Sequence, residues 1–507
     1  MNEAAAGPEG SRRTVQMLLV LLVVAGIAMR LLWLDRLTGI DGDEAWEGMS
    51  ARHWATGDFV LWRTPTGNFP GPIQPALAAL GQWIAPSQFV TLRVPSVLTS
   101  LAAMALSWRI GARHFDAPTA RLSLLLMALL PANIAFARFG WDPSHGAMLA
   151  LAAIATALER RLVLTALLYA LALWDHPTNV FMAPMLLVVF ARAEQEAGHK
   201  PWSPRPLALL AATAAATAVL MATSDQSGQF ADPVAMLGRL VSPADWLAFG
   251  VLLARVVEGR PWFVHLAGTD CGAWGTVADL AAITLLAGTL WFAIRSLRGG
   301  RWSHCGLPAG WLAMLLAYFL IGGGAPLNAP TERYAFVLVA PTALVTAMAL
   351  RRWLGRYAGG VREAALQVAL GVMLIASTLG CYLVPLATRD RTAFVSWRGI
   401  DALRTGPVEP KEAAARWLLA QPRGAMPLRL VAEEWYLYWP LAYRLDGNAI
   451  VINAETNPDW ERRASAGPTF VATYAGSPLD RRLAQLARPA FTATGYDGRA
   501  IVHLWAR

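Results

Sequence analysis

The sequence predicts a mainly α-helical membrane protein, a polytopic bundle of about eleven transmembrane helices followed by a small C-terminal α/β domain. Hydrophobic residues fill 56% of the 507 positions and charged residues only 15%, whereas a soluble domain carries about 25% charged residues. The apolar residues fall in long blocks between short polar stretches, and the blocks have the length that a bilayer core requires. The final part of the chain is more polar and predicts the small domain.

The apolar blocks are the candidate membrane spans. The first follows Arg12 and Arg13 like a signal peptide, but it is long and has no convincing cleavage site, so we expect it to remain as the first helix. Blocks 144–158 and 162–174 are short for a full crossing, and their fusion would reverse the orientation of every later helix. The full set is 15–34, 89–110, 119–137, 144–158, 162–174, 177–192, 207–223, 276–294, 307–322, 334–350 and 364–386.

Basic residues gather in every second connection, as the positive-inside rule requires of cytoplasmic loops. The net charge of +9 therefore reflects topology, and we expect no nucleic-acid partner. The rule predicts a cytoplasmic tail 1–14, a transmembrane domain 15–392 with outer loops 35–88 and 224–275, and an extracytoplasmic domain 393–507. The inside clusters are Arg12/Arg13, Arg109/Arg113/Arg121, Arg160/Arg161, Arg192/Lys200/Arg205, Arg295/Arg298/Arg301 and Arg351/Arg352/Arg356/Arg362.

The outer segments have structure of their own. Trp246–Val257 is too short to span and contains Arg255, so it predicts a helix at the interface. The tail alternates a helix over 409–420 with strand-like runs at 428–432, 449–453, 469–473 and 501–505. Its aromatic run 433–439 could pack on the membrane domain, lie among headgroups or stack on sugars. The three cysteines have no CxxC spacing and predict neither a zinc site nor a disulfide framework.

Acidic residues cluster just after the first helix, at Asp41, Asp43 and Glu44. One of them could simply cap the helix that follows. Three carboxylates at a membrane surface repel one another, which raises the pKa of at least one unless a cation or substrate lies there. A carboxylate with a raised pKa is a better general base at neutral pH. Asp43 is therefore the first catalytic candidate, and Glu44 the second.

Three further outer turns carry polar residues. Arg138 could snorkel or hold a phosphate oxygen, and Asp142 before Pro143 could start a helix or bind substrate. His176 is either structural or a substrate ligand. Arg333 opens an apolar helix, where the helix dipole disfavours a cation, so either Glu332 or an anionic ligand should compensate it. By the orientation argument all these clusters share one side of the membrane.

In this order, the motifs resemble the GT-C-fold membrane glycosyltransferases, and within them the group of protein O-mannosyltransferases and the lipid A aminoarabinose transferase. The resemblance rests on four stretches and covers most of 15–390 in organisation. They are Asp43-Glu44-Ala45-Trp46 through Thr56-Gly57-Asp58, Arg93-Val94-Pro95-Ser96, Arg138 to Asp142, and Arg333-Tyr334 with Pro341. One departure is the first-loop Lys-Pro-Pro stretch of many relatives, which reads Gly71-Pro72-Ile73-Gln74-Pro75 here.

The resemblance implies a hexosyl- or pentosyltransferase of the bacterial inner membrane that takes its sugar from a polyprenyl-phosphate donor at the outer face. Asp43 would be the general base, and Glu44 would assist or bind a divalent metal with it. Arg138, Arg333 and Tyr334 would bind the donor phosphate. Asp41, Asp142 and His176 would bind substrate. The acceptor could be a lipid, a glycan or a protein.

Two other classes stay open at this point. A transporter or flippase for lipid-linked sugars would tend to show paired repeats or ionisable residues near the membrane midplane. Here the acids lie at the outer ends of the spans, which favours surface chemistry. A non-catalytic assembly subunit would keep a degenerate site and tolerate replacement of Asp43.

Overall fold

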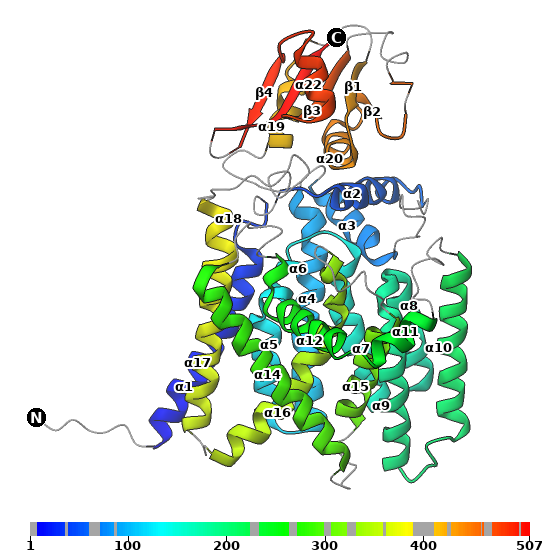
Figure 1. Ribbon diagram of the computed structural model, residues 1–507, viewed down its shortest axis with the longest axis vertical. Coiled ribbons are helices and arrows are strands. Elements are labelled where there is room, and N and C mark those ends of the chain that lie inside the picture. Colours follow the sequence, from blue (N-terminus) through cyan, green and yellow to red (C-terminus); the bar gives the residue numbers. More distant parts are fainter. Residues whose placement is uncertain are drawn as a thin grey trace, which may run out of the picture.

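The computed structural model shows a bundle of helices with a small sheet domain at one end (Figure 1). It describes residues 8–35, 39–59, 71–85, 89–223, 233–262, 271–298, 306–321, 331–357, 361–388, 410–422, 427–457, 459–460, 469–495 and 498–507. The predicted start of the C-terminal domain at 393 lies outside these residues. The mainly helical architecture with a C-terminal α/β domain is the one predicted.

Each predicted apolar block contains a helix or a pair of broken helices. Six helices are long and apolar enough to cross a membrane among the described residues, and α5, α8 and α15 are shorter apolar helices. The bundle helices are α1 (Pro8–Leu31), α4 (Phe89–His114), α5 (Ala117–Leu129), α6 (Pro131–Phe136), α7 (Gly146–Leu158), α8 (Leu162–Asp175), α9 (Met182–Glu196), α10 (Pro204–Thr223), α14 (Gly272–Arg298), α15 (Gly306–Ile321), α16 (Val339–Tyr357), α17 (Val361–Thr378) and α18 (Val384–Thr388).

The breaks follow from local sequence. Pro131 lacks the N–H that would continue α5, so the chain restarts there as α6. Between α7 and α8 the chain turns at Arg160, whose φ is 57°, so the two short blocks are separate helices. A π segment, η8 (Leu379–Leu383), joins α17 to α18. Three shorter pieces, η1 (Asp142–His145), η2 (Pro177–Phe181) and η7 (Thr331–Leu338), connect bundle helices.

Several helices do not run with the bundle. α2 (Gly42–Ala55) and α3 (Ile73–Ile84) lie at the end that carries the sheet domain, and α12 (Pro243–Glu258) crosses the bundle (Figure 1). α12 contains the predicted interfacial helix Trp246–Val257. Two small helices, α11 (Pro233–Leu240) and α13 (Arg260–Trp262), flank it.

The C-terminal domain is a five-stranded mixed sheet in the order β2-β1-β3-β5-β4. β1, β2 and β3 pair in parallel, while β5 is antiparallel to β3 and β4. The four predicted strand runs are all present, and the prediction missed β4 and the helices α20 and α22. The elements are α19 (Pro410–Leu419), β1 (Leu428–Ala432), α20 (Trp435–Leu445), β2 (Ala449–Asn453), β3 (Thr469–Tyr474), α22 (Pro478–Ala484), β4 (Phe491–Thr494) and β5 (Ala500–Ala506).

The sheet domain docks on the membrane domain through α20, which packs on α2. Tyr443 is fully buried, and its hydroxyl accepts a hydrogen bond from Gln82 Nε2 at 2.9 Å. Arg52 of α2 lies 4.0 Å from the Tyr443 ring centroid and pairs with Asp446 at 3.1 Å. Trp435 lies against Gly42. The aromatic run therefore packs, at least in part, on the membrane domain.

The close approach of α20 depends on a glycine in α2. A Cβ at Gly48 would lie 2.7 Å from Tyr443 Cε2 and 2.9 Å from Leu92 Cδ1. We expect Gly48→Ala to destabilise the fold by about 1–3 kcal/mol through overpacking, partly offset by a better helix propensity. Gly250→Ala in α12, where a Cβ meets nothing within 4 Å, is the matched control and should be neutral or stabilising. Thermal unfolding of both variants measures the difference, and equal melting temperatures would contradict the packing argument.

One disulfide bond joins Cys271 at the start of α14 to Cys381 in η8, with a Cα–Cα distance of 5.5 Å. The cysteine spacing predicted no disulfide framework, and for this pair that expectation is wrong. The two residues are 110 positions apart, and only the packing of α14 beside the end of α17 brings them together. The charge pattern places Cys271 in the outer loop 224–275 and Cys381 near the outer end of the predicted span 364–386.

Candidate functional site

The N-terminus of α2 presents acidic residues on two faces. Asp41 caps the helix, because its Oδ1 accepts the Asp43 N–H at 2.9 Å, and it is 6% exposed. Capping is one of the roles that the sequence left open for this residue. Asp43 is exposed, and Glu47 is buried one helical turn later, so the two side chains share a face. The substrate-binding role of Asp41 stays a prediction, with one of its oxygens already engaged.

Four acidic side chains from three elements form what we term the carboxylate cluster: Asp43 and Glu47 of α2, Asp142 of η1 and Asp175 of α8. Burial raises the pKa of Glu47 well above its usual value, and the charges of Asp142, Asp175 and Asp43 raise it further. Burial and then Asp43 raise the pKa of Asp142 well above its usual value. The structure thus brings together Asp43 and Asp142, which the sequence identified separately.

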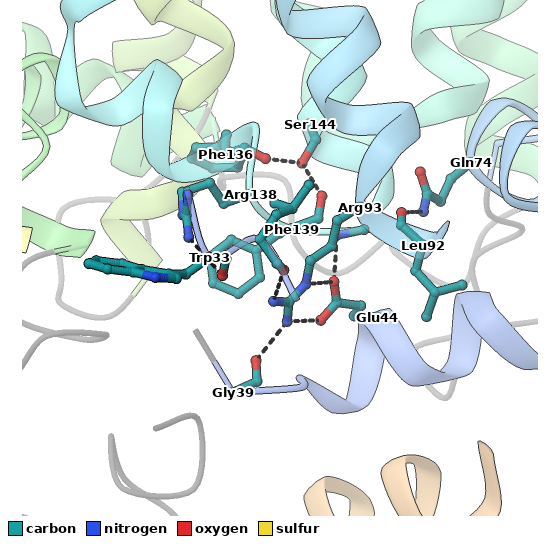
Figure 2. A network of polar contacts seen from close by, with 12 residues as sticks. Trp33, Gly39, Glu44, Gln74, Leu92, Arg93, Phe136, Arg138, Phe139 and Ser144 are labelled. Atoms are coloured by element: carbon teal, nitrogen blue, oxygen red, sulfur yellow. Dashed lines mark hydrogen bonds and ion pairs between the residues drawn. The ribbon is translucent and has the colours of Figure 1, made fainter. Parts of the chain in front are cut away.

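Glu44 points away from this cluster into a buried ion pair. Its Oε1 and Oε2 accept hydrogen bonds from Arg93 at 2.7 and 2.8 Å, and Oε1 also accepts the Gly140 N–H at 2.9 Å (Figure 2). Arg93 donates further to the carbonyls of Leu34 and Gly39. This network, which we term the Arg93 network, ties α2 to α4 and to the loop before Asp142.

The engagement of both Glu44 oxygens bears on the predicted metal site. Asp43 faces the carboxylate cluster while Glu44 faces Arg93, so the two do not present a joint pair of ligands. Among the described residues no group of three or more His, Cys, Asp or Glu side chains could hold a metal ion. Both Glu44 oxygens are thus engaged in the Arg93 network, and its assisting or metal-binding role stays a prediction.

Arg138 is fully buried at the end of α1. Its guanidinium donates to the carbonyls of Met29 at 2.7 Å, Arg30 at 3.3 Å and Trp33 at 3.4 Å, and Figure 2 shows the last of these. A cation at the last carbonyls of a helix stabilises that end. The direct phosphate contact predicted for Arg138 would require these bonds to break, and the geometry favours a structural role that holds the loop bearing Asp142.

A second buried network fixes η1 from the other side. His145 Nε2 lies 3.1 Å from Gln74 Oε1, and His145 Nδ1 lies 3.0 Å from Thr99 Oγ1. Gln74 Nε2 donates to the Leu92 carbonyl at 2.7 Å (Figure 2). The position expected to carry a phosphate-binding lysine thus lies in a stretch whose Gln74 is buried and satisfied. α4 supplies Arg93, Leu92 and Thr99, so this one helix positions both α2 and η1.

His176 and Tyr334 are brought together from the third and fourth turns. Their ring centroids are 6.3 Å apart at an interplanar angle of 23°, and Tyr334 is 39% exposed. His176 Nδ1 lies 2.7 Å from Thr178 Oγ1. Arg333 belongs to η7, but its side chain lies outside the described part of the structure. The predicted turns therefore meet at one end of the bundle, as the orientation argument required.

The sequence missed two members of the carboxylate cluster, Glu47 and Asp175. The signal for Glu47 was its spacing, because a residue four positions after Asp43 in a helix lies on the same face. Asp175 directly precedes His176, so the same turn carried both. Its burial against Gly71 could not be read from the sequence. A Cβ at Gly71 would lie 2.3 Å from Asp175 Cα.

An apolar groove opens between α5, α6, α12, α14, α16 and α17, with an empty volume of about 780 Å³. Its lining is almost entirely aliphatic, and the polar exceptions are Glu258, Thr346 and Ser377. α12 forms one wall and packs on η7, which in turn packs on η2 beside the carboxylate cluster. The groove and the cluster are therefore linked by contacting elements.

No family model matches the chain, and no curated protein matches it. Solved structures do. The ArnT of Cupriavidus metallidurans in its apo state superposes with a TM-score of 0.55 at 13% identity over 97% of both chains. The same protein bound to undecaprenyl phosphate gives a TM-score of 0.52 at 14% identity over 97% of both chains.

An Archaeoglobus fulgidus oligosaccharyltransferase, in a complex with zinc and sulfate, matches 96% of this chain and 73% of its own with a TM-score of 0.50 at 14% identity. Likeness at such low identity establishes the fold. The chain is a multi-pass membrane protein with the GT-C fold, as its motifs predicted.

Proposed function

We propose that this protein is an integral membrane glycosyltransferase that moves a sugar from a polyprenyl-phosphate donor to an acceptor hydroxyl at the outer face of the bacterial inner membrane. The observation that carries the proposal is the meeting of Asp43 and Asp142 at one end of a GT-C bundle. The ArnT structure with bound undecaprenyl phosphate supports a lipid carrier of this class.

In the proposed reaction Asp43 is the general base. It takes the proton of the acceptor hydroxyl as that oxygen bonds to the anomeric carbon, and the bond from this carbon to the phosphate oxygen breaks. The electron pair leaves with the polyprenyl phosphate, and the configuration at the anomeric carbon inverts. Asp43 lies in the first turn of α2 and is the most exposed of the four cluster residues. This exposure suits a group that must contact the hydroxyl of an incoming acceptor.

Charge develops on the leaving phosphate, where preorganised donors help most. Tyr334, exposed beside His176, and its neighbour Arg333 are the residues we assign to this phosphate. Arg138 and Glu44 act through others: Arg138 holds the loop that bears Asp142, and Glu44 holds α2 through Arg93. The proposed roles of these two residues are thus positional.

The apolar groove suits the polyprenyl tail of the donor. Its walls are aliphatic, and isoprene units would gain the transfer free energy of buried apolar surface. Its contact through α12 and η7 leads toward the carboxylate cluster, so a tail in the groove would place its phosphate near Tyr334. A donor of this shape could reach the site from within the membrane.

The disulfide supports the proposed orientation. Disulfide bonds persist in oxidising compartments such as the bacterial periplasm. The positive-inside rule also places Cys271 in an outer loop and Cys381 near the outer end of its span. Two independent physical arguments therefore agree on the side that carries the sheet domain.

A substitution at Ala281 tests both the proposed transferase activity and the proposed binding of the polyprenyl tail in the groove. We expect Ala281→Trp, which fills the groove from α14, to weaken donor use at least tenfold, because it displaces tail atoms from apolar surface. Purified protein is incubated with undecaprenyl phosphates that carry glucose, galactose, mannose or a pentose, together with lipid, glycan and peptide acceptors. Release of undecaprenyl phosphate is measured.

Leu280→Trp is the matched control. Leu280 is the preceding residue of the same helix, is 60% exposed and does not line the groove. It should leave donor use unchanged. If the wild-type protein moves the sugar-carrying undecaprenyl phosphate (the loaded lipid) across vesicle membranes without consuming it, the protein is a transporter and the proposal is wrong. If both tryptophan substitutions weaken donor use equally, the groove does not bind the polyprenyl tail.

A further inference from the structure

Two buried carboxyl groups of the cluster, those of Glu47 and Asp175, have oxygens without a hydrogen-bond partner in the part of the chain that the structure describes. Among the described residues, neither Oε2 of Glu47 nor either oxygen of Asp175 has a hydrogen-bond partner. Glu47 is 3% exposed and Asp175 is 0% exposed. Burying an acidic oxygen without a partner is costly, so native proteins keep such groups rarely and at sites with a use.

Two other acids of this chain show how a carboxylate that is shielded from water is usually paired. Glu44 is paired with Arg93, and Glu159 lies within 3.0 Å of the guanidinium groups of Arg109, Arg113 and Arg161. Glu47 and Asp175 have no comparable cation within the described ranges. The charged groups that act on them electrostatically are other carboxylates of the cluster.

The two carboxylates come from different elements and face one space. Glu47 lies on the Asp43 face of α2, and Asp175 ends α8; Glu47 interacts electrostatically with Asp175 and Asp142. Gly71 closes over Asp175, since a Cβ there would lie 2.9 Å from Asp175 Oδ1. The oxygens without partners are thus screened from bulk water, with Asp43 and Asp142 near Glu47 and Asp142 near Asp175.

We propose that Glu47 and Asp175 form the donor-sugar subsite, in which their free oxygens accept hydrogen bonds from ring hydroxyls of the sugar on the polyprenyl phosphate. This inference rests on the proposed function and names specificity-determining residues for it. A sugar ring carries several O–H donors around its edge, and a carboxylate is the side chain with the largest acceptor capacity. A carboxyl group that burial keeps protonated still accepts such bonds at its carbonyl oxygen.

The neighbours of Asp175 favour the donor sugar, and not the acceptor, as the ligand of this subsite. His176 follows it in sequence and stacks on Tyr334 of η7. η7 packs on α12, which lines the apolar groove through Val257 and Glu258. Asp175 is therefore on the side of the cluster that the lipid carrier would occupy, while Asp43 is exposed and open to the acceptor.

The test compares loaded and bare carrier lipid in the full-length protein. Binding of undecaprenyl phosphate, and of the same lipid loaded with whichever sugar the wild-type protein consumes, is measured for Glu47→Gln and Asp175→Asn. We expect each variant to bind the loaded lipid about 10–100-fold more weakly, the effect of losing one or two hydrogen bonds at a buried carboxyl group. Affinity for the bare lipid should be unchanged.

Asp58→Asn is the control, because Asp58 is an exposed acid just beyond the same helix, paired with His53. It should alter neither affinity. The melting temperature of the protein without lipid is the second measurement. If Glu47 and Asp175 were purely structural, replacing either one would lower it. If their oxygens have no partner in the protein, each substitution should leave the melting temperature unchanged or raise it.

The outcomes separate the inference from the proposed function. If the wild-type protein consumes a donor while both variants bind loaded lipid as it does, the subsite assignment is wrong and the function stands. If no loaded lipid is consumed by the wild-type protein, the proposed function fails. Loss of folding in both variants, or loaded-lipid binding that requires an added divalent cation and disappears with chelator, would also overturn the hydroxyl subsite.

Discussion

Asparagine in place of Asp43 should lower the rate of sugar transfer about 10²–10⁴-fold, the usual contribution of a general base. The amide keeps the shape of the carboxylate but cannot take the acceptor proton. Because Asp43 is exposed and its backbone N–H, not its side chain, holds the Asp41 cap, the substitution should not unfold α2. Release of undecaprenyl phosphate in single-turnover conditions measures the effect.

Binding of the loaded donor serves as the control for this variant. It should remain close to that of the wild-type protein, because the proposed donor contacts lie on Glu47, Asp175 and Tyr334. An unchanged transfer rate in Asp43→Asn would place the protein among the non-catalytic assembly subunits. A loss of binding equal to the loss of rate would make Asp43 a donor ligand instead of a base.

The same variant also reports on the electrostatics of the cluster. Burial is the main cause of the raised pKa values of Glu47 and Asp142, and the charge of Asp43 adds to both, so its neutralisation should remove part of each shift. A carboxyl group whose pKa is raised by folding destabilises the folded state progressively as pH rises above its unfolded pKa. The wild-type protein should therefore lose stability between about pH 4 and the raised values, and Asp43→Asn should lose less.

The largest effect on stability is expected from Arg93. Arg93→Ala leaves the fully buried Glu44 without its cation and removes the donors to Leu34 and Gly39. Breaking one side of a buried ion pair costs about 3–5 kcal/mol. α2 loses its attachment to α4, so transfer activity should fall along with the free energy of unfolding. Chemical denaturation in detergent, with assay of the folded fraction, measures both.

A double substitution separates the pair from the charge. Arg93→Met combined with Glu44→Met removes both ions and should be less destabilising than Arg93→Ala, because no uncompensated charge stays buried. It should still impair transfer, since the Gly140 N–H loses its acceptor. If the double variant is less stable than Arg93→Ala, the ion pair itself stabilises this region, and the cost of Arg93→Ala is not explained by the uncompensated charge of Glu44.

The elements with a periodic or compositional signal could be predicted from sequence. Apolar blocks predicted the bundle helices, and alternation predicted β1, β2, β3 and β5. β4 is only four residues long and offers too short an alternation. α20 was missed because its aromatic residues suggested a surface for stacking as readily as a helix.

The site was predictable in its location but not in its pairings. Asp43, Asp142, His176 and Tyr334 each stand in a polar turn between apolar blocks, so their convergence followed from the orientation argument. The partnership of Glu44 with Arg93 joins residues 49 positions apart, and no local pattern encodes it. The same holds for Asp175, whose burial depends on Gly71, and for the disulfide bond.

The docking of α20 on α2 bears on when this protein becomes competent during its synthesis. Arg52 is made early, yet its partner Asp446 emerges 394 residues later. N-terminal parts of a chain are made and fold first, so the bundle can enter the membrane while α2 still lacks the surface that holds it down. The helix that carries Asp43 therefore acquires its final packing only after α20 has been made, and a product truncated before α20 would leave α2 in the membrane protein without this contact.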